Sequence, residues 1–186
     1  MRFAIVLRKQ KIDNPWQNYR WRPIEVVPDI GQFGKVLEQA GTEQNKKVLG
    51  RFLERDEQGE SWLFAGFDFN FFRDEAEGYF LNSTSPEPCW FVMWRMETEY
   101  QPYLEPDSMG MVDNDDGAGL AVPHRLMLSY NEAARLIDGG EQVDTTPLQA
   151  EMKAWLADYV AANYKPEPKK RAKPVSFKGA NRPAES

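Results

Sequence analysis

The sequence holds very little of the chemistry that builds covalent or metal cross-links. Its 186 residues include one cysteine, Cys89, and one histidine, His124. A single cysteine excludes a disulfide within the chain. The two residues together are too few for a Cys- or His-rich zinc site, an iron–sulfur cluster or a CxxC redox motif. We therefore expect the chain to carry no metal ion and no cofactor.

Long apolar runs and recognisable catalytic motifs are also missing. The longest apolar run, around residues 89–94, is far shorter than the about 18–20 residues that a membrane-spanning helix needs. The N-terminus lacks the apolar core and cleavage site of a signal peptide. The sequence contains no phosphate-binding loop, dinucleotide-binding glycine motif, serine-hydrolase elbow or zinc-protease motif. We expect a cytoplasmic protein with no membrane contact and no catalytic residues.

Basic residues are concentrated at the C-terminal end. Residues 165–186 hold seven basic and two acidic residues, a net charge of +5, so the net charge of −6 for the whole chain leaves −11 for residues 1–164. The segment is rich in Pro and poor in apolar residues, which predicts a flexible tail after a single globular domain of residues 1–164. The tail is either a solubilising end or a docking segment for an acidic partner. Its candidate partner-binding residues are Lys169, Lys170, Arg171 and Phe177. Nucleic acid is the weaker prediction, because an acidic body repels phosphates.

Apolar residues alternate with polar residues through most of the first 128 positions, which is typical of half-buried β-strands. The spacing of these segments and of the turn residues between them favours an antiparallel β-barrel or sandwich of about seven strands over βαβ units. Pro23 marks an edge strand or a bulge. The expected strands are 3–8, 19–27, 48–54, 62–71, 77–82, 89–96 and 122–128.

The clearest strand is predicted at residues 62–71, and residues 48–54 pair with it in a hairpin closed at Gln58-Gly59. Strict alternation places one set of side chains on a single face of that strand: Leu63, Ala65, Phe67, Phe69 and Phe71.

The C-terminal third has a helical period, which makes the fold class α+β with two C-terminal helices. Ser129 and Glu132 fit a capping box, in which the Ser hydroxyl accepts the amide of Glu132 and the Glu side chain reaches back. Gly139 is a suitable helix end. A second capping box is predicted at residues 146–149, opening a helix with one apolar face that packs on the sheet or on a partner. That face comprises Leu148, Met152, Trp155, Leu156, Tyr159 and Val160.

Three features are candidates for chemistry, and each has a structural interpretation. His124 has no orienting carboxylate or nucleophile in a local motif, and Cys89 precedes the apolar Trp90, so both are predicted to be structural. Residues 97–116 are acidic and contain no Lys or Arg. Their Asp113–Gly117 stretch fails the calcium-loop register, since His124 stands where the bidentate Glu belongs. The acidic loop is expected to be solvated, with weak cation binding or attraction of a basic partner or of the basic tail as alternatives.

Aromatic residues beside Asn14 and Pro15 are the remaining signal. Trp16, Tyr19 and Trp21 lie in a loop and at the start of a strand. Exposed Trp and Tyr residues are common in protein-recognition surfaces. The alternative is a loop that closes one end of a barrel.

The order of several short motifs resembles one bacterial protein family, domain of unknown function 3305. These motifs are Asn14-Pro15-Trp16-Gln17 with Tyr19 and Trp21, Tyr79 with Leu81-Asn82, Ser85-Pro86 with Pro88, Ser129-Tyr130 with Glu132-Ala133, Asp138-Gly139-Gly140-Glu141 with Val143, Pro147, and Trp155-Leu156. The resemblance covers roughly residues 3–171. Members typically lie beside genes for molybdenum- or tungsten-dependent formate dehydrogenases and their maturation factors. The resemblance therefore implies an accessory role in assembling or regulating such an enzyme, with that enzyme or a maturation factor as protein partner. It supplies no catalytic residues.

Two functions follow as expectations. The first is a non-catalytic binding protein that uses the aromatic loop, the acidic loop and the basic tail. The second is a small enzyme or divalent-metal-binding protein whose carboxylates converge only in the folded chain.

Overall fold

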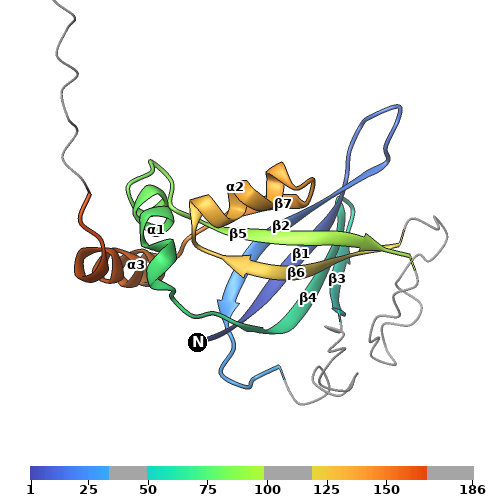
Figure 1. Cartoon of the computed structure of the whole chain (residues 1–186). Coiled ribbons are helices and arrows are strands. Elements are labelled where there is room, and N and C mark those ends of the chain that lie inside the picture. Colours follow the sequence, from blue (N-terminus) through green and yellow to red (C-terminus); the bar gives the residue numbers. More distant parts are fainter. Residues whose placement is uncertain (34–49, 99–118, 167–186) are drawn as a thin grey trace, which may run out of the picture.

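Two antiparallel sheets and three α-helices make up the computed structural model, which describes residues 1–33, 50–98 and 119–166 (Figure 1). The larger sheet has the strand order β2-β1-β4-β3, and the smaller has the order β6-β5-β7. The strands are β1 (Arg2–Lys11), β2 (Tyr19–Pro28), β3 (Gly50–Asp56), β4 (Gly59–Asp68), β5 (Cys89–Glu97), β6 (Leu120–Met127) and β7 (Gln142–Pro147). The helices are the short 3₁₀ turn η2 (Arg73–Glu75), α1 (Ala76–Ser83), α2 (Tyr130–Asp138) and α3 (Ala150–Asn163).

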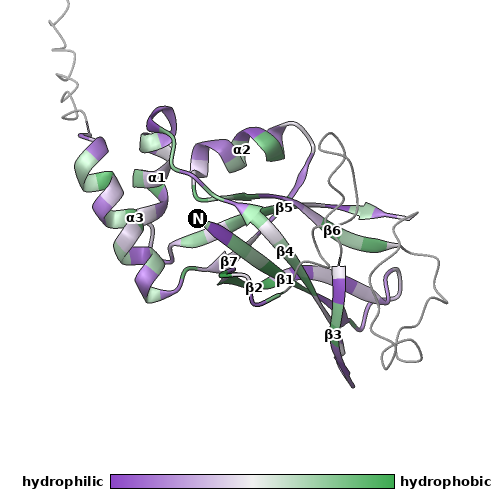
Figure 2. Ribbon diagram, turned by 90° about the horizontal axis from the view of Figure 1, so that it is seen from below, coloured by the Kyte–Doolittle hydropathy of each residue, from purple (hydrophilic) through white to green (hydrophobic). Residues whose placement is uncertain are grey.

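The α+β prediction is confirmed in its sandwich form, and the described residues form no closed barrel. The two sheets approach each other at β2 and β7, where side chains replace a continuous backbone ladder. The Thr146 hydroxyl donates to the Ile24 carbonyl at 3.0 Å, and the Gln149 amide donates to the Val26 carbonyl at 2.5 Å. Apolar residues run along the central strands of both sheets (Figure 2), and the buried set includes Phe3, Leu7, Trp62, Trp90 and Val92.

Aromatic rings join the helices to one end of the sandwich. Phe71 stacks on Tyr159 of α3 with ring centroids 3.9 Å apart, and it meets Tyr79 of α1 edge-on at 5.0 Å. Phe69 contacts Trp90 of β5 and Trp155 of α3. The predicted apolar face of α3 therefore packs on the chain's own core. Figure 1 shows α1 and α3 at this end, while the β1–β2 hairpin projects from the opposite end.

The expected strand at residues 77–82 is wrong, because this segment is helix α1. Its packing explains the difference: a Cβ atom on Gly78 would lie 2.1 Å from the Ser129 hydroxyl oxygen, so the helix rests directly on the start of α2. The seventh strand is instead β7, which occupies the connection expected between the two helices and the first two residues of the second predicted capping box. The described residues form three α-helices where two were predicted.

Strict alternation along residues 62–71 is also wrong. Gly66, with φ of +95°, lies where the register between β1 and β4 shifts, as an extra residue in a β-bulge does. The bulge reverses the facing, so Trp62, Phe64, Phe67 and Phe69 all reach the main core. Leu63 and Ala65 pack in a small cluster of their own with Ala4 and Val6. The predicted β3–β4 hairpin itself is confirmed, and so is a register shift beside Pro23 in the edge strand β2.

The two predicted capping boxes have different outcomes. The Ser129 hydroxyl accepts the Glu132 amide at 3.1 Å, as expected, but the Glu132 carboxylate pairs with Arg125 at 2.6 Å and does not reach back. The box at residues 146–149 is wrong. Thr146 belongs to β7, α3 begins at Ala150, and its N-cap residue Gln149 makes no side-chain capping bond. The Thr146 hydroxyl instead joins the two sheets.

The Asn82 side chain connects α1 to the smaller sheet through hydrogen bonds. Its side chain is 1% exposed. The amide nitrogen donates to the Cys89 and Leu128 carbonyls, both at 2.8 Å, and the amide oxygen accepts the Cys89 backbone N–H at 3.0 Å. One buried side chain thus satisfies backbone groups at the start of β5 and just before α2.

Replacing Asn82 by Ala should destabilise the fold strongly. The substitution leaves buried backbone groups without partners, at about 1–3 kcal/mol each, so we expect a loss of about 2–5 kcal/mol in urea unfolding. The matched control is Asn163→Ala, because Asn163 makes one exposed bond to the Tyr159 carbonyl and should cost no more than about 0.5 kcal/mol. Equal losses for the two variants would show that Asn82 has no special structural role.

Candidate functional site

The turn of the β1–β2 hairpin presents Trp16 to solvent. The Asn14 side chain accepts the Trp16 backbone N–H at 2.9 Å, and the Ile12 N–H donates to the Asn18 carbonyl at 3.0 Å. Pro15 restricts the backbone between them. Within this ordered turn the Trp16 side chain is 94% exposed. Trp16 therefore does not cover the end of the sandwich, which was the alternative interpretation of the loop.

The other two predicted aromatics lie at increasing depth. Tyr19 is half-buried, with the Lys9 ammonium 4.4 Å from its ring centroid. Trp21 is buried, with 7% of its surface exposed, and belongs to the main core. Of the three aromatic residues, Trp16 is therefore exposed, Tyr19 is half-buried and Trp21 is part of the core. Of the three candidates, only Trp16 and Tyr19 are available to a partner at the surface.

A cavity of about 590 Å³ lies between this hairpin and the nearby ends of β5 and β7. Trp21, Trp94 and Met96 give it an apolar lining, and the Trp94 indole is fixed because its N–H donates to Asp144 at 2.8 Å. The remaining lining is polar: Lys9, Gln17, Asn18, Tyr19, Arg20 and Gln142. An apolar pocket with polar groups around it is suited to a single large side chain of a binding partner.

The sequence prediction missed Trp94, Met96 and Gln142. They come from strands about 75–120 positions along the chain from the hairpin, and no local pattern connects them to it. The sequence does carry one signal for the basic members of the site, which is the charge of the hairpin itself.

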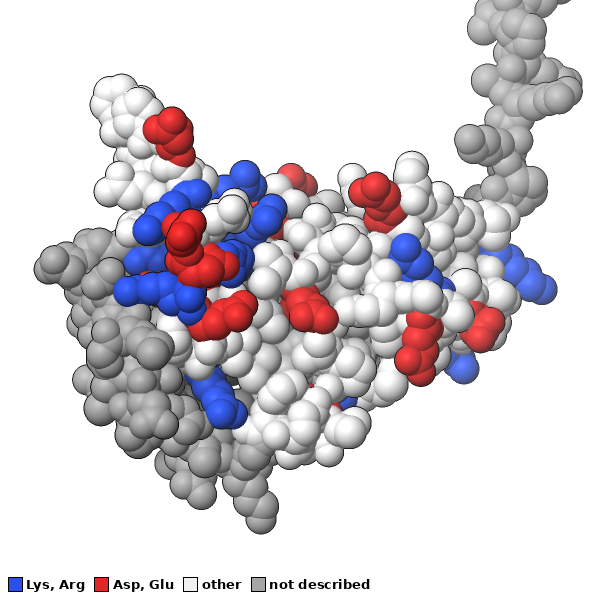
Figure 3. Space-filling model, turned by 180° about the vertical axis from the view of Figure 1, so that it is seen from behind, with Lys and Arg blue, Asp and Glu red and all other residues white. Residues whose placement is uncertain are grey.

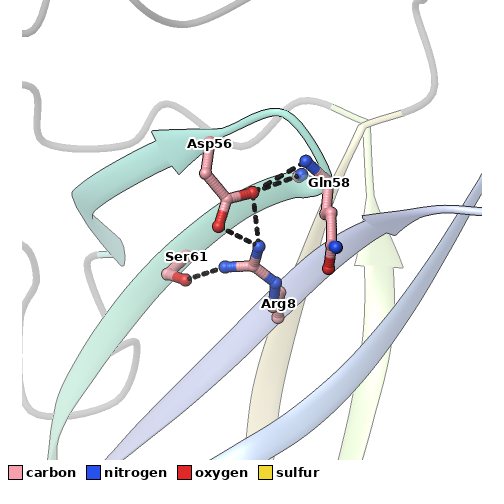
Figure 4. A network of polar contacts seen from close by, with 5 residues as sticks. Arg8, Asp56, Gln58 and Ser61 are labelled. Atoms are coloured by element: carbon pink, nitrogen blue, oxygen red, sulfur yellow. Dashed lines mark hydrogen bonds and ion pairs between the residues drawn. The ribbon is translucent and has the colours of Figure 1, made fainter.

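Arg8 fixes the base of the hairpin to the neighbouring β3–β4 turn (Figure 4). Its guanidinium donates to both carboxylate oxygens of Asp56 at 2.6 Å and to the Ser61 hydroxyl at 2.9 Å. Asp56 also accepts the backbone N–H groups of Gln58 and Gly59. The Arg8 hydrogen bond and then the Gln58 N–H lower the pKa of the Asp56 carboxyl below its ordinary 3.8.

His124 and Cys89 lie away from this site. His124 Nε2 lies 2.8 Å from Glu97 Oε1, and both side chains are one-third exposed. His124 also borders a second cavity of about 370 Å³ with Asp68, Glu132 and Tyr79. Burial raises the pKa of the Glu132 carboxyl and raises that of Tyr79 to about 12. No Ser, Thr or Cys lines this cavity among the described residues. The Tyr79 phenol does line it, but its raised pKa opposes ionisation to a nucleophilic phenolate.

Cys89 is partly buried, and burial raises the pKa of its thiol, which opposes thiolate chemistry. In the part of the chain that the structure describes, no three His, Cys, Asp or Glu residues are grouped to hold a metal ion. Over the same residues, no helix has both the length and the apolar character that crossing a membrane requires. Lys169, Lys170, Arg171 and Phe177, and the acidic loop beyond Thr98, lie outside the described residues.

Comparison with protein families finds one match. A family model described as "Protein of unknown function (DUF3305)" matches residues 2–173. Neither the curated proteins nor the solved structures contain a match to this chain.

The Asp56 contacts predict a pH-dependent contribution to stability. Because the folded pKa lies below the ordinary value, the folded state binds fewer protons, and the stabilisation is fully present above the ordinary pKa of 3.8. It is lost as the pH falls through the lower folded value. At about pH 7, Asp56→Asn should therefore unfold at a lower urea concentration than the natural chain. The difference between the two unfolding midpoints should become smaller at about pH 3. A gap that stays constant between the two pH values would contradict this.

Proposed function

The chain belongs to the DUF3305 family of proteins of unknown function, and we propose that it is a non-catalytic binding protein that recognises a protein partner through its β1–β2 hairpin. The observation that carries the proposal is Trp16, which is 94% exposed on an ordered turn. Trp is enriched among residues that dominate binding energy in protein interfaces. A fixed turn also lowers the conformational entropy lost on binding.

The cavity beside the hairpin supports the same proposal. Trp16 offers a projecting ring, and the pocket bordered by Trp21, Trp94 and Met96 offers a place for a side chain of the partner. Trp21 and Trp94 are at most 7% exposed, so the pocket is built on the core of the sandwich and does not depend on loop residues alone. Trp16 is then able to insert into the partner while a side chain of the partner inserts into the pocket.

We propose formate dehydrogenase, or one of its maturation factors, as the partner. The support is the family resemblance described above, which implies an accessory role in assembling or regulating the molybdenum- or tungsten-dependent enzyme. We place this activity in the cytoplasm and assign the chain no cofactor. The basic residues Lys169, Lys170 and Arg171, with Phe177, are proposed as a second contact.

A second candidate function is a small enzyme or metal-binding protein. The observation that favours it is the smaller cavity, where His124 lies with Asp68 and Glu132. Against it, Glu132 is engaged by Arg125 and His124 by Glu97.

Trp16→Ala should abolish recovery of the partner while leaving the fold intact. In pull-downs from the native host, the tagged natural chain should recover formate dehydrogenase or a maturation factor, and the variant should not. The melting temperature should change by no more than about 2 °C, because an exposed substitution costs at most about 0.5 kcal/mol. Ile30→Ala is the matched control, since Ile30 is an 88% exposed apolar residue outside the hairpin and should leave recovery unchanged.

Trp21→Ala tests whether Trp21 has a structural role that Trp16 lacks. Because Trp21 is buried, its loss should destabilise the chain by about 3–5 kcal/mol in urea unfolding. If Trp16→Ala destabilised the chain by a similar amount, Trp16 would be a packing residue and the proposal would fail.

A non-catalytic role predicts that His124 and Cys89 are dispensable. The double variant His124→Ala/Cys89→Ala should recover the partner as well as the natural chain does and should preserve the cellular phenotype. Urea unfolding checks that it folds. Loss of the phenotype in a stably folded double variant would favour the enzymatic alternative.

A further inference from the structure

The β1–β2 hairpin is a basic segment in an acidic chain. Residues 8–22 contain five basic residues and one acidic residue, a net charge of +4, whereas the chain as a whole carries −6 and the remainder therefore −10. Figure 3 shows Lys and Arg side chains gathered around the base of the projecting hairpin, with acidic side chains between them. The proposed recognition surface thus has the opposite charge to the rest of the chain.

The strand register places three of these cations on one face. Arg8 lies opposite Arg22, and Arg20 lies opposite Gln10. Directly opposed residues in an antiparallel pair share a face, and like charges so placed are destabilising. Asp56 compensates Arg8. Arg20 and Arg22 are exposed, and no carboxylate of the described residues forms an ion pair with either.

Arg20 borders the apolar pocket together with Trp21, Trp94 and Met96. Arg22 does not line it, because Arg20 and Arg22 alternate with Trp21 along the edge strand β2 and share the opposite face with Arg8. Guanidinium groups bind carboxylates through two parallel hydrogen bonds. Arg and Trp are both frequent energetic anchors of interfaces. The edge strand β2 therefore carries two carboxylate-binding side chains on one face, and a pocket for one large apolar side chain opens on its other face.

We propose that the hairpin binds an acidic segment of the partner protein, with carboxylates on Arg20 and Arg22 and a neighbouring aromatic or large aliphatic side chain that reaches past the edge strand β2 into the pocket. This inference rests on the proposed function and names the chemistry of the partner. A protein segment fits better than a nucleic acid, which requires an extended run of cations along many phosphates. Here Arg8 is already held by Asp56 and the Lys9 ammonium lies over the Tyr19 ring.

Charge reversal with a matched control tests the proposal on the full chain. The probe is a short fluorescein-labelled peptide with a central Phe flanked by Glu residues, followed by fluorescence anisotropy. Arg20→Glu/Arg22→Glu should weaken its binding by at least about tenfold, because both attractive contacts become repulsive. The control is Arg73→Glu/Lys153→Glu, which changes the net charge equally on exposed residues of η2 and α3 and should change affinity by less than about twofold.

Two further probes identify what the site recognises. A peptide with Gln in place of every Glu should bind at least about tenfold more weakly. Added salt should lower the affinity of the acidic peptide, because the screening length falls from about 10 Å at 0.1 M to about 3 Å at 1 M. The proposal is overturned if both double variants lose affinity equally, or if the Gln peptide binds as well as the Glu peptide. It is also overturned if a labelled single-stranded oligonucleotide binds more tightly than the acidic peptide. The same holds if light scattering shows that the arginine substitutions act only by dissociating a dimer of the chain.

The outcomes remain separate from those of the Trp16 experiment. If Trp16→Ala abolishes partner recovery but the acidic peptide does not depend on Arg20 and Arg22, the binding function stands and the acidic specificity falls. If the peptide depends on the two arginines while Trp16→Ala recovers the partner normally, the acidic site stands and the hairpin tip is not its recognition element.

Discussion

The aromatic cluster at one end of the sandwich is the interaction on which the rest of the arrangement depends. Phe69 and Phe71, just beyond β4, contact rings from β5, α1 and α3. Burying such rings is a large stabilising contribution, of about 1.5–3 kcal/mol for each large side chain. Because both sheets and two helices converge there, the opposite end of the molecule does not have to supply the same burial. The hairpin is therefore able to project, and an exposed Trp16 at its tip costs the fold little.

The base of the hairpin is held in place by hydrogen bonds more than by apolar packing. Arg8, Asp56 and the β3–β4 turn are joined by hydrogen bonds, and Gly59 makes the close approach possible, since a Cβ atom there would lie 2.0 Å from the Lys9 carbonyl oxygen. The projecting strands are thus held at their base by polar contacts and at Trp21 by burial. A loop fixed in this way loses less conformational entropy when a partner binds. The contacts that stabilise the sheet therefore also fix the hairpin that we propose as the recognition surface.

Local patterns in the sequence predicted the features that local physics determines. The Ser129 cap, the β3–β4 hairpin and the apolar face of α3 follow from spacing over a few residues. The errors fall where distant contacts decide. Residues 77–82 are helical because Gly78 packs on Ser129, Thr146 joins the sheets and caps no helix, and Gly66 reverses the facing of β4. The pocket was equally out of reach, because Trp94, Met96 and Gln142 meet the hairpin only in the folded chain.

The net charge of the chain describes its surface poorly. The net charge of −6, and of −11 for residues 1–164, predicts a basic binding segment in the tail alone. At physiological salt the screening length is only about 8 Å, so a binding segment responds to the few charges beside it and hardly to the total. The hairpin, with a net charge of +4 over residues 8–22, is a separate electrostatic environment on that scale. In the proposed binding mode, the acidic residues around the hairpin repel a long polyanion that extends past it, whereas a short acidic segment does not reach them.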